Sequence, residues 1–285
     1  MTGTGADSYL LGHSADELDR LTRQAAFLGD LTEDVLRRAG LQPGMRVLDV
    51  GCGAGDVALI AGRMVGPDGA VLGIDRTAEP LSLARQRAAQ AGMGWVRFEQ
   101  QDATALPPGP LFDAVVGRLL LINVPDPGGL LRTLVRQVRP GGVVAFQEMD
   151  ITRCNAVPQT PVMQQLLVWG VTLFERAGLL PDAGTRLAAL FRGAGITPSL
   201  IGACRMESVG EGFGYTWIAQ TFRSLAPMLH RLEIATPEAL DIDTLETRLR
   251  QEAQEHGACL VCPLMVGAWG RVPGAAADQS PAGRA

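Results

Sequence analysis

The chain has 285 residues, of which 47% are hydrophobic and 19% are charged, and its formal net charge is −5. This hydrophobic fraction supports a buried core and excludes a wholly disordered chain. The acidic balance argues against nucleic acid as a partner, because proteins that bind its backbone carry clustered excess base. All 25 basic residues are arginine, which excludes Schiff-base chemistry on lysine and the lysine of a P-loop.

The cysteine count and the chain ends favour a cytoplasmic protein. The 5 cysteines are odd in number and scattered, and the first residues lack the basic start and apolar run of a signal peptide. The longest apolar stretches, around 166–174 and 259–269, fall well short of the ~20 residues that span a bilayer, so we expect no membrane insertion. Residues 1–8 and 273–285 are expected to be disordered tails. The sequence is compatible with a homodimer but does not predict one.

Residues 9–40 are predicted to form an N-terminal helical flap. Ser14 and Glu17 have the spacing of a capping box, and leucine and alanine then recur at helical intervals. Gly29 and Asp30 interrupt this pattern, so we expect a second, short helix over 31–39.

Strands and helices alternate from residue 41 to 150, which predicts the core of an α/β fold. Helices are expected over 56–65, 79–91 and 128–138, and a turn at 139–142. Strands are expected over 46–50, 70–74, 95–100, 112–117 and 143–149. This alternation is typical of a Rossmann-like, doubly wound, mostly parallel sheet with helices on both faces.

The remainder, 151–272, is predicted to complete a seven-stranded sheet and to add a helical cap. Two further strands are expected over 199–206 and 258–270, and a long helical insertion between them would lie above one edge of the sheet. Helices are expected over 161–177, 184–194, 212–231 and 244–256.

Glycine and aspartate residues follow three successive predicted strands. Gly51, Gly53 and Gly55 form a turn after the first strand, and Asp75 closes the second, where an acid can accept hydrogen bonds from ribose hydroxyls. Asp102 follows the third strand, where its side chain and the Ala103 amide can meet an adenine edge. Because open parallel sheets bind ligands at the carboxyl ends of their strands, this set predicts a nucleoside site.

The motifs that carry these residues resemble a known series. They are Val47-Leu48-Asp49-Val50-Gly51-Cys52-Gly53-Ala54-Gly55, Gly73-Ile74-Asp75, Gln101-Asp102-Ala103, Phe112-Asp113-Ala114-Val115-Val116 and Arg139-Pro140-Gly141-Gly142. In this order, over residues 40–150, they resemble the class I S-adenosylmethionine-dependent methyltransferases. The resemblance implies S-adenosyl-L-methionine as cofactor, with Asp49 helping to place its amino-acid end, the glycine turn making room for it and Asp75 holding its ribose.

Other candidate cofactor contacts have simpler alternatives. Arg76 follows Asp75, as a 2′-phosphate reader of an NADP enzyme would, but the retained Asp75 and the glycine spacing argue against that cofactor. Arg118 and Leu119 end the fourth strand, where the arginine can contact the cofactor carboxylate or an anionic substrate, or form a surface ion pair. Residues 9–13 and 20–26 are similar to the flap of bacterial small-molecule methyltransferases, so Tyr9 and Gln24 are candidate cofactor neighbours or ordinary packing residues.

The catalytic candidates are Glu148, Asp150 and His230. Glu148 and Asp150 lie two apart on an extended segment and so share a face, while His230 has an exposed helical position as its alternative. Two carboxylates without a third ligand are too few to predict a metal. Aromatic residues of the cap are expected to line an apolar acceptor pocket in part; they are Trp169, Phe174, Phe213, Tyr215, Trp217 and Phe222.

The sequence therefore predicts methyl transfer to oxygen or carbon of a small, apolar metabolite as the acceptor. The alternative is a non-methylating protein that binds S-adenosylmethionine in a cyclase or a regulatory role.

Overall fold

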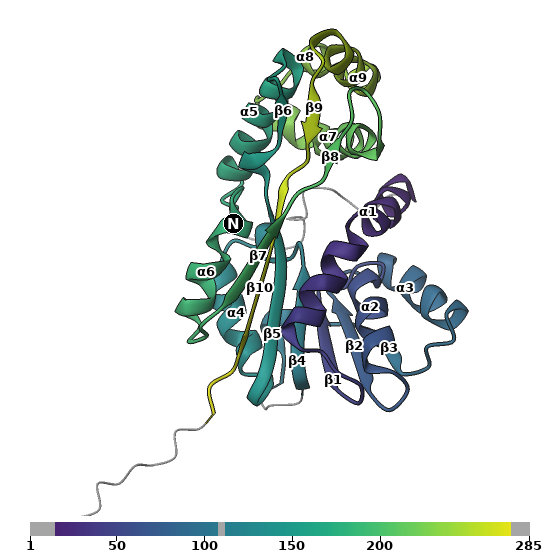
Figure 1. The fold of residues 1–285 in the computed structure, drawn as a ribbon, viewed down its shortest axis with the longest axis vertical. Coiled ribbons are helices and arrows are strands. Elements are labelled where there is room, and N and C mark those ends of the chain that lie inside the picture. Colours follow the sequence, from purple (N-terminus) through teal and green to yellow (C-terminus); the bar gives the residue numbers. More distant parts are fainter. Residues whose placement is uncertain (1–14, 108–111, 275–285) are drawn as a thin grey trace, which may run out of the picture.

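The computed structural model describes residues 15–107 and 112–274, and its main feature is a seven-stranded sheet with strand order β3-β2-β1-β4-β5-β10-β7 (Figure 1). The strands are β1 (Arg46–Val50), β2 (Ala70–Asp75), β3 (Val96–Gln100), β4 (Phe112–Arg118), β5 (Val138–Asp150), β7 (Ser199–Ala203) and β10 (Leu264–Arg271). The first five pair in parallel, whereas β10 runs antiparallel to both β5 and β7. The predicted fold class, a mostly parallel Rossmann-like sheet, is confirmed.

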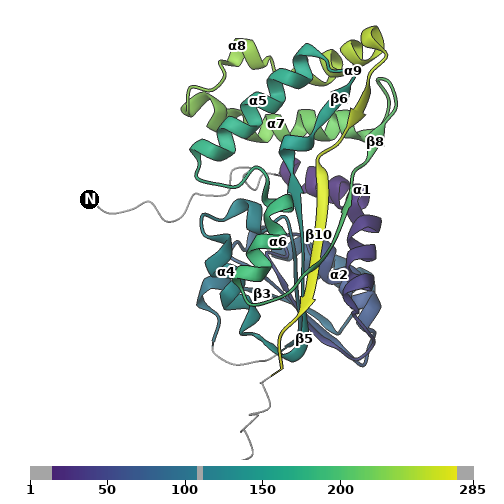
Figure 2. The ribbon, with the colours of Figure 1, turned by 60° about the vertical axis from the view of Figure 1, so that its left-hand side comes forward.

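Helices cover both faces of this sheet, because its central strands are apolar on both sides. Val47, Leu48 and Val50 of β1 are fully buried. One face carries α1 (Ala15–Ala39), α2 (Asp56–Val65) and α3 (Glu79–Gln90), and the opposite face carries α4 (Pro127–Val135) and α6 (Ala183–Gly193) (Figure 2).

The helix α1 is continuous, so the predicted break at Gly29-Asp30 is wrong. Leu28 and Thr32 on either side of the glycine are both buried, and Thr32 Oγ1 donates to the Leu28 carbonyl oxygen at 3.1 Å. A glycine inside a helix costs about 1 kcal/mol. Burial of the flanking residues outweighs this local cost.

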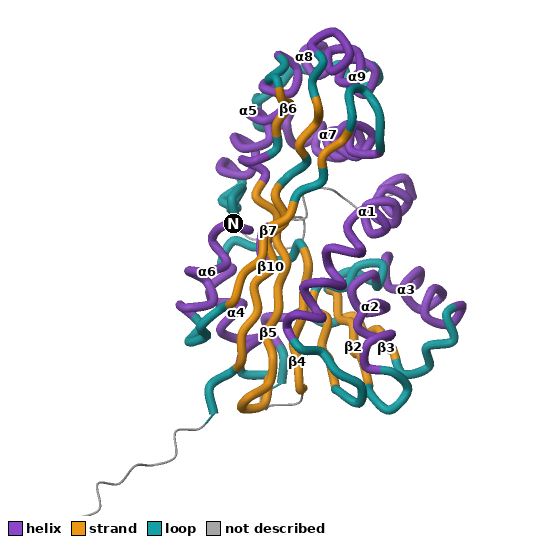
Figure 3. The backbone as a smooth tube through the Cα atoms, viewed as in Figure 1, coloured by secondary structure: helices purple, strands orange, loops and turns teal. Residues whose placement is uncertain are grey.

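The cap is a second lobe above the carboxyl ends of the strands (Figure 3). A small antiparallel sheet in the order β6-β9-β8 forms part of it. The cap elements are β6 (Asn155–Val157), α5 (Pro161–Arg176), β8 (Met206–Glu207), α7 (Phe213–Arg231), α8 (Pro237–Leu240), α9 (Leu245–His256) and β9 (Cys259–Val261). Their buried side chains form an apolar cluster separate from the clusters on the two faces of the large sheet.

Two predicted strands are each divided between the lobes, which corrects their predicted extent. The segment 199–206 supplies β7 to the large sheet and begins β8 in the small one, and 258–270 supplies β9 and then β10. The break between β9 and β10 includes Pro263, which has no backbone N–H to donate to a neighbouring strand. The chain thus crosses between sheet and cap twice in this region.

The predicted turn at 139–142 is an irregularity inside a longer β5, since the pairing shifts from Phe112↔Val138 to Ala114↔Val143. The described residues also include the short 3-10 helices η1 (Ala103–Ala105), η2 (Leu121–Asn123) and η3 (Ile151–Arg153). The predicted tails lie outside the described residues, except for 273 and 274.

Candidate functional site

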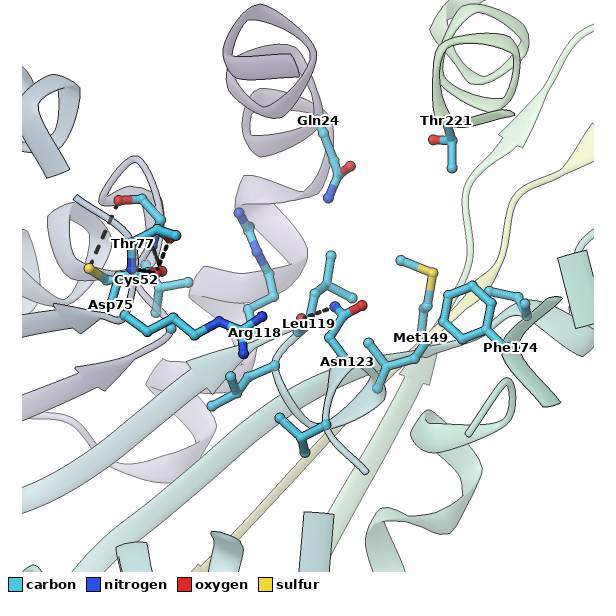
Figure 4. Close-up of a pocket in the computed structure, with 18 of the residues that line it drawn as sticks. Gln24, Cys52, Asp75, Thr77, Arg118, Leu119, Asn123, Met149, Phe174 and Thr221 are labelled. Carbon is cyan, nitrogen blue, oxygen red and sulfur yellow. Dashed lines mark hydrogen bonds between the residues drawn. The ribbon is translucent and has the colours of Figure 1, made fainter. Parts of the chain in front are cut away.

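A cavity of about 800 Å³ lies between the carboxyl ends of the sheet strands and the cap. Its polar end is formed by the turns after β1, β2, β3 and β4, and its apolar end by α5, α7 and the end of β5. Figure 4 shows both ends, with Asp75 and Thr77 on one side, Met149 and Phe174 on the other and Arg118 between them.

The glycine turn shapes the polar end. Gly51 has φ 68° and Gly53 has φ 49°, in the left-handed region that glycine adopts without strain. A Cβ on Gly51 would lie 2.9 Å from Cδ1 of Leu120, whereas one on Gly53 would meet no atom within 4 Å. Both line the cavity. Gly55 does not line it, because it packs against Phe98 beneath the turn.

Asp75 connects the first two strand ends. Its Oδ2 accepts from Gly53 N at 3.0 Å, and its Oδ1 accepts from Thr77 N at 3.0 Å and Thr77 Oγ1 at 2.7 Å. These bonds fix the carboxylate at the cavity wall, in the position predicted for a ribose acceptor. Thr77 was not among the predicted site residues. It lies two positions after Asp75, in the turn that follows β2.

The third strand end places Asp102 and Ala103 on the same wall, which Arg76 also lines from the turn after β2. Asp102 Oδ1 accepts from Thr104 N at 2.8 Å and from its hydroxyl at 2.7 Å, and these bonds lower the pKa of Asp102. The carboxylate thereby caps η1 and holds the Ala103 backbone at the cavity.

Asp49 lies beneath the turn and does not line the cavity itself. Its side chain is 1% exposed, and neither carboxylate oxygen has a hydrogen-bond partner of normal geometry among the described residues. Burial raises the pKa of Asp49 from 3.8 to about 7, while the nearby Arg118 lowers it. A buried carboxylate without donors is a costly arrangement that an incoming cationic group would relieve.

Arg118 lines the cavity, and its charge lowers the pKa of this carboxylate. Its guanidinium is 3.6 Å from Asp56 Oδ2 and donates to Thr32 Oγ1 at 2.9 Å. Asp56 also pairs with Arg87 at 2.6 Å. Arg118 is therefore part of a buried network and not of a surface ion pair, and it presents a cation beside the polar end.

Leu119 follows at φ 55°, a left-handed conformation that is uncommon outside glycine. Its carbonyl oxygen accepts from Asn123 Nδ2 at 2.8 Å, and both residues line the cavity (Figure 4). Asn123 is a second lining residue that sequence reasoning missed, because only the folded loop turns it toward the cavity.

Gln24 lines the cavity from α1, and Tyr9 lies outside the described residues. Gln24 Oε1 accepts from the indole N–H of Trp217 at 2.9 Å, so α1 is attached directly to the cap.

The apolar end is enclosed by aliphatic, aromatic and sulfur-containing side chains, three of which were predicted as pocket aromatics. The lining includes Met149, Ile151, Cys154, Met163, Leu166, Leu167, Phe174, Trp217, Ile218, Phe222 and Leu225. Among the predicted aromatics, Phe174, Trp217 and Phe222 line the cavity, whereas Trp169, Phe213 and Tyr215 do not.

The structure does not bring the predicted catalytic residues to the cavity wall. Because side chains alternate along a strand, Met149 faces the cavity while Glu148 and Asp150 point to the opposite face. There Asp150 accepts from Thr185 Oγ1 of α6 at 2.9 Å, and Glu148 binds backbone amides of η2. His230 lies in the last turn of α7, away from the lining residues.

The described residues contain neither a candidate metal site nor a candidate membrane span. No group of three His, Cys, Asp or Glu side chains there is arranged to hold a metal ion. No helix in that part of the chain has the length and apolarity to cross a bilayer.

The fold is a Rossmann-like domain whose polar cavity end combines a glycine turn, an acid at the end of β2 and, beneath the turn, a buried carboxylate. A family model described as a methyltransferase domain matches residues 41–175. This region of the chain is a class I S-adenosylmethionine-dependent methyltransferase domain, and S-adenosylmethionine is the methyl donor that this family implies.

Individual relatives agree with this assignment. The demethylmenaquinone methyltransferase of Geobacillus kaustophilus is 37% identical over 133 residues, covering 46% of this chain and 57% of that protein. The 2-phytyl-1,4-naphtoquinone methyltransferase of Synechococcus elongatus is 40% identical over 126 residues, covering 44% and 52%. The chain thus spans about half the length of these curated relatives. The crystal structure of the YcgJ protein from Bacillus subtilis is similar in fold, with a TM-score of 0.55 and 21% identity, covering 84% of this chain and 98% of that one.

Proposed function

We propose that the protein transfers a methyl group from S-adenosylmethionine to oxygen or carbon of a small, largely apolar metabolite. The observation that carries the proposal is the continuity of the cavity, which joins the polar strand ends to the apolar space under α5 and α7. Such a cavity can hold a cofactor and an acceptor end to end.

The polar end offers a group suited to each polar part of the cofactor. Asp75 would accept the ribose hydroxyls, and the open face of Gly53 leaves room for a ligand close to the backbone. The orphaned Asp49 carboxylate and the Arg118 guanidinium have the charges needed for an ammonium and a carboxylate of an amino-acid tail. When bound, the cofactor supplies an electrophilic methyl group on a sulfonium.

The apolar end would orient the acceptor and exclude water. Among the described residues, the acids that line the cavity are Asp56, Asp75, Asp102 and Asp126, and all four belong to the polar end. The described lining of the apolar end contains no aspartate, glutamate or histidine. In-line displacement depends mainly on alignment of the reacting atoms in a water-poor site. We therefore expect positioning of the acceptor to supply most of the rate enhancement. The acceptor then reacts as an ionised oxygen or an activated ring carbon.

The acceptor class is proposed from the lining together with the relatives. Both curated relatives are named for quinone substrates, and an aromatic ring carrying a hydroxyl suits a pocket of leucine, methionine and phenylalanine. We therefore propose a hydroxylated aromatic or quinol-like metabolite as the first acceptor to test.

The experiment measures formation of S-adenosylhomocysteine by the full chain with a panel of reduced naphthoquinones, phenols and polar amines. Turnover with the aromatic hydroxyl compounds, and none with the amines, is the expected result. Binding of S-adenosylhomocysteine without turnover on any acceptor would instead favour the non-methylating alternative. An absence of binding would reject both.

A further inference from the structure

The carboxylate of Glu148 lies inside the fold and binds three consecutive backbone amides. Its Oε1 accepts from Leu120 N at 3.0 Å and Leu121 N at 2.8 Å, and its Oε2 accepts from Ile122 N at 3.2 Å. The residue is 0% exposed. The carboxylate therefore holds the first turn of η2 from below.

The segment that Glu148 holds forms part of the cavity wall. Leu119, Leu120, Ile122 and Asn123 all line the cavity. Leu120 also packs on the glycine turn, where its Cδ1 would lie 2.9 Å from a Cβ placed on Gly51. The position of this segment thus sets the distance between the wall after β4 and the turn after β1.

The segment also has an unfavourable conformation of its own. Leu119 at φ 55° costs free energy unless the surrounding contacts compensate. Leu119 N donates to the Gln147 carbonyl oxygen at 2.9 Å, and Asn123 closes the loop on the Leu119 carbonyl. Residues 147 and 148 of β5 therefore fix both the strained residue and the amides that follow it.

We propose that Glu148 is a positioning residue of the cofactor site, which holds residues 119–123 in the conformation that binds S-adenosylmethionine. This inference rests on the proposed function. It assigns to Glu148 a role through the loop, and not contact with the reacting atoms.

The chemistry of the contact explains why a carboxylate is required. Three N–H donors converge on two oxygens, and a carboxyl group satisfies all three because both of its oxygens accept. Burial raises the pKa of Glu148 to about 8, while these three donors lower it. Glutamine at this position keeps one carbonyl oxygen but directs an NH₂ group at one of the donors. A buried N–H left without its acceptor destabilises the local structure, so the loop is expected to shift.

The test compares Glu148→Gln with Asp113→Asn. Asp113 is the control, because its carboxylate also accepts a backbone N–H, that of Arg46 at 2.7 Å, and pairs with Arg139 at the amino end of β4, outside the cavity lining. Three quantities are measured on each full-length protein: the melting temperature, the calorimetric affinity for S-adenosylhomocysteine, and hydrogen exchange of the amides of residues 120–122.

We expect Glu148→Gln to exchange these three amides faster and to bind S-adenosylhomocysteine about tenfold more weakly, the factor for one lost buried hydrogen bond. Asp113→Asn should lower the melting temperature without either change. If Glu148→Gln does not fold, Glu148→Asp, which keeps the carboxyl group but withdraws it by one methylene, is expected to give the same pattern.

Two results would overturn the inference. Unchanged exchange at 120–122 would mean that the carboxylate does not hold the loop, and faster exchange with wild-type affinity would limit Glu148 to stability. Failure of the wild-type protein to bind S-adenosylhomocysteine would be a separate result, since it contradicts the proposed function before any variant is compared.

Discussion

The indole N–H of Trp217 donates to Oε1 of Gln24 at 2.9 Å and so joins α7 of the cap to α1. Phe27 of α1 extends this contact, with its ring centroid 5.6 Å from that of Trp217 and 5.4 Å from that of Phe213. Arg205 also binds α1, through the Phe27 carbonyl and Asp30. The N-terminal helix and the cap therefore enclose the cavity together.

The first prediction concerns this contact. Trp217→Phe keeps an aromatic ring but removes the donor, and should lower stability by about 1–3 kcal/mol because Gln24 Oε1 loses its buried partner. A double-mutant cycle with Gln24→Leu should give a coupling of about 1 kcal/mol by chemical denaturation. Strict additivity of the two substitutions would show that the hydrogen bond does not link the helices.

The second prediction concerns Asp75. Asp75→Ala removes the acceptor of the Gly53 amide and of the proposed ribose hydroxyls. Loss of two hydrogen bonds to a charged group should weaken S-adenosylhomocysteine binding by about 100-fold in calorimetry. Asp68→Ala, an exposed acid just before the same strand, is the control and should bind normally. Equal affinities of the two variants would reject the assignment of Asp75.

The third prediction concerns pH and Asp49. Its pKa is raised to about 7, so it takes up a proton below that pH in the free protein. A bound ammonium group favours the ionised carboxylate, so the affinity for S-adenosylhomocysteine should rise from pH 6 to 8, by up to about tenfold per pH unit. Calorimetry should show this slope in the wild type and not in Asp49→Asn. A slope that survives the substitution would assign the titration to another group.

The same shift predicts a change in stability with pH. An acid whose folded pKa lies above its usual 3.8 stabilises the folded state at low pH, and this contribution is lost as pH rises toward about 7. The free energy of unfolding of the wild type relative to Asp49→Asn should therefore fall over that interval. Urea titrations at several pH values would measure it, and a difference that grows with pH would contradict the shift.

The fourth prediction separates the two ends of the cavity. Gly170 of α5 lines the apolar end, and an added Cβ would lie 3.6 Å from Phe222 Cζ, an ordinary contact. Gly170→Ala should therefore fold and be stabilised by up to about 1 kcal/mol through helix propensity. Gly170→Leu should reduce acceptor kcat/KM at least tenfold by occupying the apolar space.

Both Gly170 variants should bind S-adenosylhomocysteine as the wild type does, because the polar end is untouched. If Gly170→Leu weakens S-adenosylhomocysteine binding by the same factor as it lowers acceptor kcat/KM, the two ends do not hold separate ligands. Unchanged acceptor kinetics in that variant would place the acceptor elsewhere.

Parts of the fold and of the cavity wall were predictable because they depend on residues that are neighbours in the sequence. The apolar run of β1 and the glycines after it specify a buried strand and a left-handed turn, and Asp75 ends the next strand in the same way. The position of Arg118 at the end of β4 followed from the same logic, although its burial between α1, α2 and the sheet did not. Predictions based on local pattern succeeded where local geometry decides the outcome.

The orientation of the catalytic candidates, in contrast, could not be predicted from local pattern. The spacing of Glu148 and Asp150 correctly gave them a common face, but nothing in the spacing indicates which face meets the cavity. Packing of α6 against β5 decides this, since Thr185 of α6 bonds to Asp150. Likewise, Gly29 interrupts a helix by local propensity, and only the burial of Leu28 and Thr32 keeps α1 continuous.

Local sequence pattern was enough to predict the alternating α/β order and the glycine and acidic residues at the strand ends, because strand periodicity, glycine conformation and chain direction are local properties. Long-range packing was needed to show that α1 and the cap enclose one cavity with those strand ends, and that Glu148 faces inward to the loop after β4. These outcomes depend on burial and hydrogen bonding between segments far apart in the chain, such as Gln24 with Trp217 and Glu148 with Leu121.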